Sequence, residues 1–301
     1  MRSLVIGYGS IGQRHTRLLD ELGAAPAVVS RRRMDDRKAY VDIADALSAH
    51  QPDLVVIANE TGAHLAAVRE LADLGFRGRV LVEKPLFAYR APLPPHSFSD
   101  LRVGYNLRCD PLVIALRARL DGAPRLVQAA VGQYLPDWRQ GRDWRLCYSA
   151  DPARGGGVLR DLSHELDLLL WLCGPVRDVA ALGGSSGLLP ITSDDHWSIL
   201  AAFQNGSQAS LQLDYLNRPG RRFFAAEQEG RSVIVDFLAG TLSVNGEVEH
   251  FTLSRDESYR RQLEAMLSGN TEDLCDADGG MRVMELIALI ERRAQTGWAD
   301  R

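Results

Sequence analysis

The chain has 301 residues, of which 46% are hydrophobic and 25% charged, and its formal net charge is −4. This length predicts about two domains of roughly 150 residues, with enough chain for two cores. The mildly acidic balance, in which both signs are mixed, argues against a protein that binds nucleic acid.

The first hundred residues alternate between short apolar strands and helices of about a dozen residues. Continuous apolar strands joined by helices indicate a parallel sheet covered on both faces, so we expect a doubly wound α/β domain here. The strands are expected at residues 2–6, 26–30, 53–58, 79–83 and 101–105, and the helices at 11–22, 40–49 and 64–74.

The pattern changes after residue 110. Turn signals such as Asn205-Gly206 separate alternating strands between residues 176 and 251, which is typical of an antiparallel meander. We therefore expect two domains, 1–110 and 111–301, the second of them an α+β domain. Its other elements are expected as helices at 112–120, 158–172, 257–267 and 280–293 and a strand at 125–133.

A G-x-G-x-x-G motif, formed by Gly7, Gly9 and Gly12, follows the first strand and opens the first helix. The first glycine permits a tight turn, the second lets backbone approach a pyrophosphate, and the third lets helix and strand pack closely. Together with Ser10 and Ile11 at the start of the helix, these glycines are expected to bind the phosphates of a dinucleotide.

The end of the second strand indicates which dinucleotide is bound. NAD sites usually carry a carboxylate there for the ribose 2′-hydroxyl, whereas this chain has Ser30 and Arg31, which suit a 2′-phosphate. We therefore expect NADP(H) to be preferred over NAD(H). Arg32 and Arg33 are interpreted as solvated loop charges.

Two further motifs follow the glycine-rich turn along the chain. Glu83-Lys84-Pro85 ends the fourth strand, and Gly155-Gly156-Gly157 opens a segment that contains Asp161 and His164. In this order, and with the glycine-rich turn, these motifs make the chain resemble the glucose-fructose oxidoreductase and inositol dehydrogenase (Gfo/Idh/MocA) family over most of its length.

The resemblance implies a Rossmann domain, a second domain with a large, mostly antiparallel open sheet, and hydride transfer between nicotinamide and a sugar, polyol or sugar nucleotide. It also implies that Lys84 lies between the nicotinamide ribose and a substrate hydroxyl, beside Glu83, and that the bond to Pro85 is often cis. A homo-oligomer, a dimer or tetramer formed through the C-terminal sheet, is expected, and neither nucleic acid nor a membrane is an expected partner.

The choice of lysine at this position is itself informative. Lys plus Arg number 35, yet only Lys38 and Lys84 are lysines. A compact ammonium can bond the oxygen that gains charge during hydride transfer, and a lysine, unlike an arginine, can also release its proton. Lys84 is therefore expected to be catalytic, whereas Lys38 lies in a polar loop and is interpreted as incidental.

Asp161 and His164 are expected on one face of the helix at 158–172, one turn apart. The carboxylate would then orient an imidazole that exchanges a proton with a substrate hydroxyl. The more common family spacing is four residues, and here it is three. Two assignments stay open: His164 is the acid/base, or Asp161 binds the substrate while His164 is displaced.

Other candidates lie in loops. Asn59 and Thr61 follow the third strand, where the loop is expected to face the cofactor, although the family more usually has Thr-Pro there. Tyr134, Trp138 and Arg145 precede the glycine run and suit a polar substrate; the alternative is a solvated loop whose tryptophans fill the core. Arg108 is a further substrate candidate. The loop before the glycine run also contains Asp137, Arg139, Arg142 and Trp144.

The leading interpretation is an NADP(H)-dependent oxidoreductase in which Lys84 and His164 exchange the proton and Asp161 orients the pair. One alternative is a non-catalytic dinucleotide sensor of the same fold, against which the retention of these three residues argues. Another is a biliverdin-reductase-like member, against which the segment from Gly155 to Asp167 argues.

The remaining features point to an ordinary cellular setting. Four widely spaced cysteines suggest thiols in a reducing cytosol, with no disulfide framework and no zinc site. No basic leader precedes a long apolar run, and the apolar stretch 166–173 is too short to span a bilayer. We therefore expect a soluble cytoplasmic protein without a bound metal.

Overall fold

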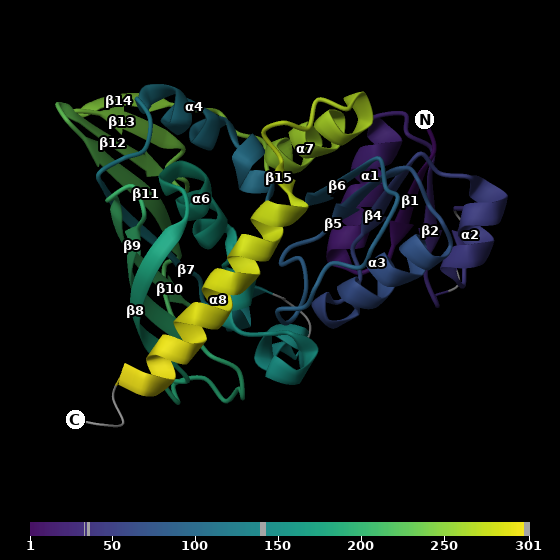
Figure 1. The fold of residues 1–301 in the computed structure, drawn as a ribbon, viewed down its shortest axis with the longest axis horizontal. Coiled ribbons are helices and arrows are strands. Elements are labelled where there is room, and N and C mark those ends of the chain that lie inside the picture. Colours follow the sequence, from purple (N-terminus) through teal and green to yellow (C-terminus); the bar gives the residue numbers. More distant parts are fainter. Residues whose placement is uncertain (33, 35–36, 139–142, 298–301) are drawn as a thin grey trace. The chain divides into compact units, whose positions relative to one another are not determined.

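A computed structural model describes residues 1–32, 34, 37–138 and 143–297. The chain divides into two compact units. The first contains residues 1–109 and 255–281, and the second contains residues 110–254 and 282–301. Figure 1 shows the elements of each unit.

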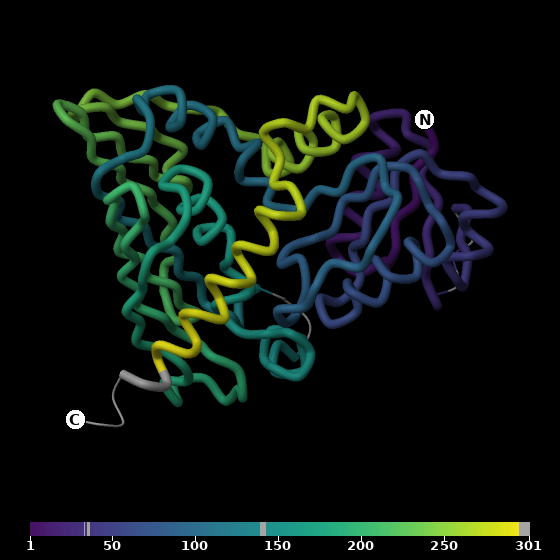
Figure 2. Tube along the Cα trace, in the orientation of Figure 1, coloured from purple at the N-terminus to yellow at the C-terminus, as the bar shows by residue number. Residues whose placement is uncertain are grey.

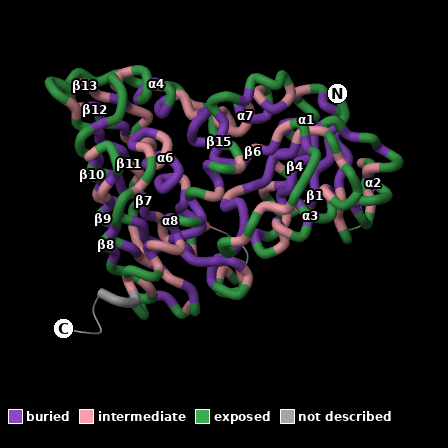
Figure 3. The backbone as a smooth tube through the Cα atoms, viewed as in Figure 1, coloured by how far each residue is buried: buried purple, intermediate pink, exposed green. Residues whose placement is uncertain are grey.

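The first unit is built on a seven-stranded sheet in the order β15-β6-β5-β4-β1-β2-β3. All of its pairings are parallel except that of β15 with β6. The two central strands, β1 and β4, are buried along their whole length, which explains their continuous apolar sequence (Figure 3). The strands are β1 (Ser3–Ile6), β2 (Pro26–Val29), β3 (Ala39–Tyr40), β4 (Leu54–Ile57), β5 (Arg79–Val82), β6 (Asp100–Val103) and β15 (Cys275–Asp276).

Helices connect these strands as the apolar spacing predicts. One difference is that residues 39–40 form a strand, so the expected helix at 40–49 begins later, at Ile43. Asp42 fixes that start, because its side chain accepts a hydrogen bond from the Asp45 amide at 2.8 Å. The helices are α1 (Ser10–Glu21), α2 (Ile43–His50), α3 (His64–Asp73) and α7 (Glu257–Ser268), with 3-10 turns η1 (Thr61–Ala63) and η2 (Asn106–Cys109).

Residues 255–281 pack with the first unit, although they were expected in a second domain spanning 111–301. β15 pairs with the edge of β6, and α7 packs against α1 and η2, so these distant parts of the chain lie side by side (Figure 2). These contacts extend the sheet beyond β6 by one short strand and cover one face of α1. The first stretch of the first unit ends at residue 109, and the second unit begins at residue 110.

The second unit contains an eight-stranded sheet in the order β14-β13-β12-β11-β7-β10-β9-β8. It is antiparallel except for the pairing of β7 with β10. It is therefore not the simple meander expected, because β7, which comes first in the chain among the strands of this sheet, lies between β10 and β11. The strands are β7 (Leu126–Gly132), β8 (Val176–Gly184), β9 (His196–Phe203), β10 (Gln208–Asp214), β11 (Arg221–Gln228), β12 (Arg231–Asp236), β13 (Thr241–Val244) and β14 (Glu247–His250).

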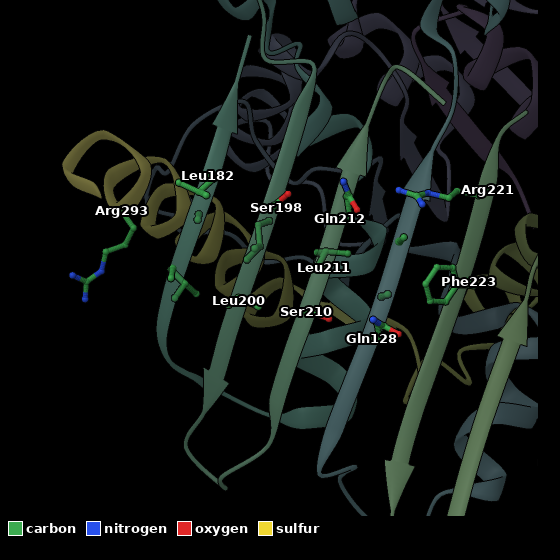
Figure 4. Close-up of a pocket in the computed structure, with 16 residues that line it drawn as sticks. Gln128, Leu182, Ser198, Leu200, Ser210, Leu211, Gln212, Arg221, Phe223 and Arg293 are labelled. Atoms are coloured by element: carbon green, nitrogen blue, oxygen red, sulfur yellow. The ribbon is translucent and has the colours of Figure 1, made fainter. Parts of the chain in front are cut away.

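Helices pack on one face of this sheet, and the side chains of the other face are exposed (Figures 1 and 4). Burial alternates along β9, where Trp197, Ile199 and Ala201 are buried while Leu200 is 61% exposed. The helices are α4 (Pro111–Arg119), α5 (Val158–Asp161), α6 (His164–Cys173) and α8 (Ala277–Gly297), with 3-10 turns η3 (Leu135–Trp138), η4 (Trp144–Leu146), η5 (Tyr148–Ala150) and η6 (Pro152–Arg154).

The prediction of a single helix at residues 158–172 is wrong, because two helices, α5 and α6, occupy this range. The Leu162 amide still bonds four residues back, to Val158 O at 2.9 Å, but the Ser163 amide bonds only three back, to Arg160 O at 3.4 Å. This change of bonding ends α5 at Asp161 and starts α6 at His164. The two residues therefore do not share one face of a continuous helix.

No helix in the part of the chain that the structure describes is long and apolar enough to cross a membrane.

Candidate active site

The glycine-rich turn between β1 and α1 has the close contacts that its motif predicts. Gly7 has a φ of +97°, and a Cβ there would lie 2.6 Å from the Asn59 Cα. A Cβ on Gly12 would overlap the carbonyl oxygen of Gly7, whereas a Cβ on Gly9 would meet only open space. The turn therefore leaves room over Gly9 for a ligand.

The start of α1 places backbone hydrogen-bond donors beside the open space over Gly9. The Gln13 amide makes the first helical bond, to Gly9 O at 2.9 Å. The amides of Ser10, Ile11 and Gly12 precede it and have no acceptor within the helix. These donors and the helix dipole suit the phosphates of a dinucleotide.

The residues after β2 are tied to the same turn. Ser30 Oγ accepts a hydrogen bond from the Arg32 amide at 3.0 Å, and Arg32 Nη1 donates to Tyr8 O at 3.4 Å. The Arg37 guanidinium lies 5.7 Å from the centre of the Tyr8 ring. Arg31 and Arg32 are exposed. Arg32, interpreted from the sequence as a solvated charge, thus contacts the glycine-rich turn, and Arg33 lies outside the described residues.

The loop after β4 meets the loop after β5 through His64. Its Nδ1 lies 3.0 Å from Pro85 O and its Nε2 lies 3.3 Å from Asn59 O. Burial lowers the pKa of His64, so the ring is neutral at pH 7 and donates a hydrogen bond to one of these two carbonyl oxygens. Asn59 is beside Gly7, and its Oδ1 is buried without a hydrogen-bond partner among the residues that the structure describes. Thr61 is buried in η1.

Glu83 and Lys84 follow β5. Glu83 is buried; its Oε1 lies 2.7 Å from His15 Nε2, and its Oε2 accepts the Lys84 amide at 3.1 Å. Burial disfavours the charged carboxylate, but the hydrogen bond and charge of His15, together with Lys84, outweigh it and lower the pKa of Glu83. The Lys84–Pro85 bond is cis, as the resemblance implies.

In the second unit, the glycine run lets two segments approach the start of α5. A Cβ on Gly156 would overlap Tyr148 O, and one on Gly157, whose φ is +117°, would overlap the Asp194 carboxylate. That carboxylate accepts the Leu159 amide at 2.9 Å and Trp197 Nε1 at 2.7 Å. The run is thus required for Asp194 to cap α5.

Asp161, at the end of α5, accepts a hydrogen bond from Tyr215 OH at 2.7 Å, and both residues are buried. Burial and then the charge of Asp161 raise the pKa of Tyr215, which keeps its hydroxyl protonated as a donor. The ring of Trp138 meets that of Tyr215 edge-on, with centroids 5.2 Å apart. Trp138, Tyr215 and Asp161 are therefore linked in one chain of contacts.

Sequence reasoning missed Tyr215. It follows β10, and nothing in its neighbourhood along the chain marks it as a partner of Asp161. His164, the first residue of α6, is partly exposed and lies three residues beyond the end of α5.

The other expected substrate residues lie in different settings. Tyr134 is partly buried and its ring is covered by the Arg218 guanidinium at 3.2 Å. Arg145 is exposed and its Nε donates to Asp143 at 2.8 Å, which lowers the pKa of Asp143. Arg108 is buried in η2 of the first unit. Asp137 and Trp144 belong to η3 and η4, and Arg139 and Arg142 lie outside the described residues.

No group of three or more His, Cys, Asp or Glu side chains within the described ranges could hold a metal ion.

Several solved structures share the fold over almost the whole chain. UDP-N-acetylglucosamine 3-dehydrogenase GnnA from Acidithiobacillus ferrooxidans superposes with a TM-score of 0.80 at 23% identity, covering 98% of both chains. The WlbA dehydrogenase from Bordetella pertussis, in complex with NADH and UDP-GlcNAcA, gives 0.78 at 20% identity, covering 99% of this chain and 96% of the other. Levoglucosan dehydrogenase, in complex with NADH and levoglucosan, gives 0.82 at 15% identity, covering 98% and 97%.

Two family models match most of the chain, although no curated protein matches it. Residues 1–92 match the oxidoreductase family with an NAD-binding Rossmann fold, and residues 115–243 match the GFO/IDH/MocA C-terminal domain. The glycine-rich turn, the Glu83-Lys84-Pro85 loop and the mostly antiparallel second sheet agree with both matches. The chain belongs to the Gfo/Idh/MocA family of oxidoreductases.

Proposed function

We propose that this protein is an NADP(H)-dependent oxidoreductase that acts on a sugar, a polyol or the sugar of a sugar nucleotide. The observation that carries the proposal is the loop of Lys84 in the Rossmann unit, where a buried, ionised Glu83 binds the lysine amide. The solved relatives that contain NADH and either UDP-GlcNAcA or levoglucosan support the class of substrate.

The preference for NADP(H) rests on the end of β2. No carboxylate follows this strand at residues 30–32, and the exposed guanidinium groups of Arg31 and Arg32 can pair with a 2′-phosphate. The bond from Arg32 to Tyr8 O keeps one of them beside the glycine-rich turn. Because two of the relatives were solved with NADH, the two cofactors must be compared directly.

Three residues carry the proposed chemistry. When bound, the nicotinamide exchanges a hydride with a carbon of the substrate. The ammonium of Lys84 donates a hydrogen bond to the substrate oxygen, and its proton passes to that oxygen when the oxygen gains charge. His164 is the second group that can exchange this proton, and Asp161, fixed by Tyr215, orients the substrate or the imidazole.

The substrate itself would contact the loop before the glycine run. Trp138 offers an aromatic surface, and Arg145 offers a guanidinium for a phosphate or carboxylate. Tyr134 belongs to the same loop, but Arg218 already covers one face of its ring. Arg145 is bonded to Asp143 in this structure, so a charged substrate would have to compete with that pair.

The experiment is a titration of the protein with NADPH and with NADH, followed by a panel of ketoses, keto-sugars and nucleotide sugars. We expect NADPH to bind at least about ten-fold more tightly than NADH, equivalent to about 1.4 kcal/mol, and to be oxidised with at least one substrate of the panel. Equal affinities would contradict the NADP(H) assignment. Tight binding with no oxidation across the panel would instead favour a dinucleotide sensor.

The exposed face of the second sheet is the proposed contact with a second copy of this chain. A groove of about 850 Å³ crosses β8, β9, β10, β7 and β11 (Figure 4). Most of the side chains that line it are uncharged, among them Gln128, Leu182, Leu200 and Gln212, and Arg221 and Arg293 are the charged ones. Depletion of charged residues is typical of the core of an interface between proteins.

A further inference from the structure

His15 lies in α1, five residues after the helix begins, and its side chain is fully buried. Its Nε2 lies 2.7 Å from Glu83 Oε1. Since the pKa of Glu83 is lowered, this carboxylate is an acceptor only, and Nε2 carries the proton of the bond. A charged carboxylate in the interior is thus held by a donor from the helix that follows the glycine-rich turn.

The second carboxylate oxygen reaches the loop itself. Oε2 of Glu83 accepts the main-chain amide of Lys84 at 3.1 Å. The absence of a side chain at Gly104 leaves space for this carboxylate, because a Cβ there would lie 3.1 Å from the same Oε2. One buried carboxylate therefore joins His15 of α1 to the backbone of Lys84.

Few other charged or titratable groups face this pair. The rings of His15 and Tyr259 of α7 meet edge to face, with centroids 5.7 Å apart, and the Arg14 guanidinium lies 4.8 Å from the centre of the Tyr259 ring. His64 lies close enough for Glu83 to favour its charged form. Among the described residues the second nitrogen of His15, Nδ1, has no hydrogen-bond partner, so the ring has one polar function, its bond to Glu83.

We propose that His15 is a positioning residue for Lys84: it fixes the Glu83 carboxylate, which in turn fixes the backbone of the lysine. This proposal rests on the proposed function, because it gives Lys84 the catalytic role. In this proposal α1 binds the cofactor at its N-terminus and positions Lys84 through its buried face. Removing the His15 bond would leave Oε1 of the buried carboxylate without its donor and release the lysine loop.

The presence of only two lysines allows a test without any substrate. Reductive methylation with 13C-formaldehyde labels Lys84, Lys38 and the N-terminal amine, and Lys84→Arg assigns the signal of interest. We expect His15→Leu to move or broaden the Lys84 signal by more than its line width and to leave the Lys38 signal unchanged. A Lys84 signal that superimposes on that of the unmutated protein would overturn the proposal.

Two variants separate the hydrogen bond from packing. His15→Gln keeps a donor for Glu83, so its Lys84 signal should stay near the original position. His50→Gln is the matched control, because His50 is another buried histidine of this unit and bonds backbone oxygens at Ser3 and Ala25. A Lys84 signal that moves equally in His15→Gln, or in His50→Gln, would assign the effect to general destabilisation and overturn the proposal.

If His15→Leu does not fold, His15→Asn tests the same bond, since its shorter side chain does not reach Glu83. Once a substrate is known, we expect loss of the bond to lower kcat by about ten- to a hundred-fold with KM within about two-fold, the size expected for misplaced catalytic groups. Failure of NADPH to bind would contradict the proposed function, while the lysine signals of the cofactor-free protein would still decide the link between His15 and Lys84.

Discussion

Lys84 combines a partly exposed side chain with a backbone held from the interior. Lys84→Arg preserves the positive charge, but a guanidinium does not release its proton in a protein. We expect the affinity for NADPH to stay within about two-fold and turnover to fall by about a hundred-fold. Cofactor titration and steady-state kinetics measure the two effects, with Lys38→Arg as the control that should change neither. Full turnover in Lys84→Arg would exclude a proton-transfer role for this residue.

The bond between Tyr215 and Asp161 can be removed with little change in volume. Tyr215→Phe leaves the buried carboxylate without this donor, so the free energy of unfolding should fall by about 1–3 kcal/mol. Tyr40→Phe is the matched control, because the Tyr40 hydroxyl is buried and has no hydrogen-bond partner within the described ranges. Denaturant unfolding of both variants measures the difference. Equal stabilities would mean that the Tyr215 bond contributes nothing to the fold.

The start of helix α5 depends on Gly157, because this position has no room for a side chain. Gly157→Ala combines a φ of +117° with overlap between the new methyl group and the Asp194 carboxylate. We expect the backbone strain to cost about 1–3 kcal/mol and the disturbed bonds of Asp194 to Leu159 and Trp197 to add to it.

Gly174, at the end of α6, provides the comparison. Its φ is also positive, at +81°, but a Cβ there would meet nothing within 4 Å. Gly174→Ala should therefore show the backbone cost alone, and Gly157→Ala should be the less stable of the two in chemical denaturation. The reverse order would show that Asp194 does not depend on the absence of a side chain at residue 157.

The sequence predicts those elements whose cause is local. The apolar runs of β1, β4 and β5 and the glycines of the first turn need only neighbouring residues to be recognised, and each lies where the pattern indicates. The insertion of β7 between β10 and β11, by contrast, depends on pairing between distant strands, and no period along the chain records it.

The same distinction applies to the candidate site. Glu83, Lys84 and the glycine run stand in recognisable motifs, so they could be selected from the sequence. Tyr215 and its acceptor are 54 residues apart, and His15 and Glu83 are 68 residues apart. Partners of this kind are found only after the strands and helices are placed, which is why the groups that hold the predicted residues were missed.

For the whole molecule, the proposed contact through the open sheet predicts the oligomeric state. Leu200→Glu places a charge among the uncharged side chains of the groove, where association would have to remove it from water. We expect the mass measured by light scattering after gel filtration to fall to that of one chain of 33.2 kDa. Leu238→Glu, at a position equally exposed, 61%, in the turn between β12 and β13, should leave the mass unchanged. Assembly that survives Leu200→Glu would locate the contact elsewhere.

The return of residues 255–281 to the first unit has a consequence for how this protein can recombine with its relatives. A gene fragment that ends near residue 109 encodes the glycine-rich turn and Lys84 but leaves β6 without β15 and α1 without α7. A chimaera made by exchanging that fragment alone would pair the α1 of one parent with the α7 of the other. Transfer of the whole first unit therefore requires crossovers at three places in the gene, near the codons for residues 109, 255 and 281. A single crossover cannot transfer it.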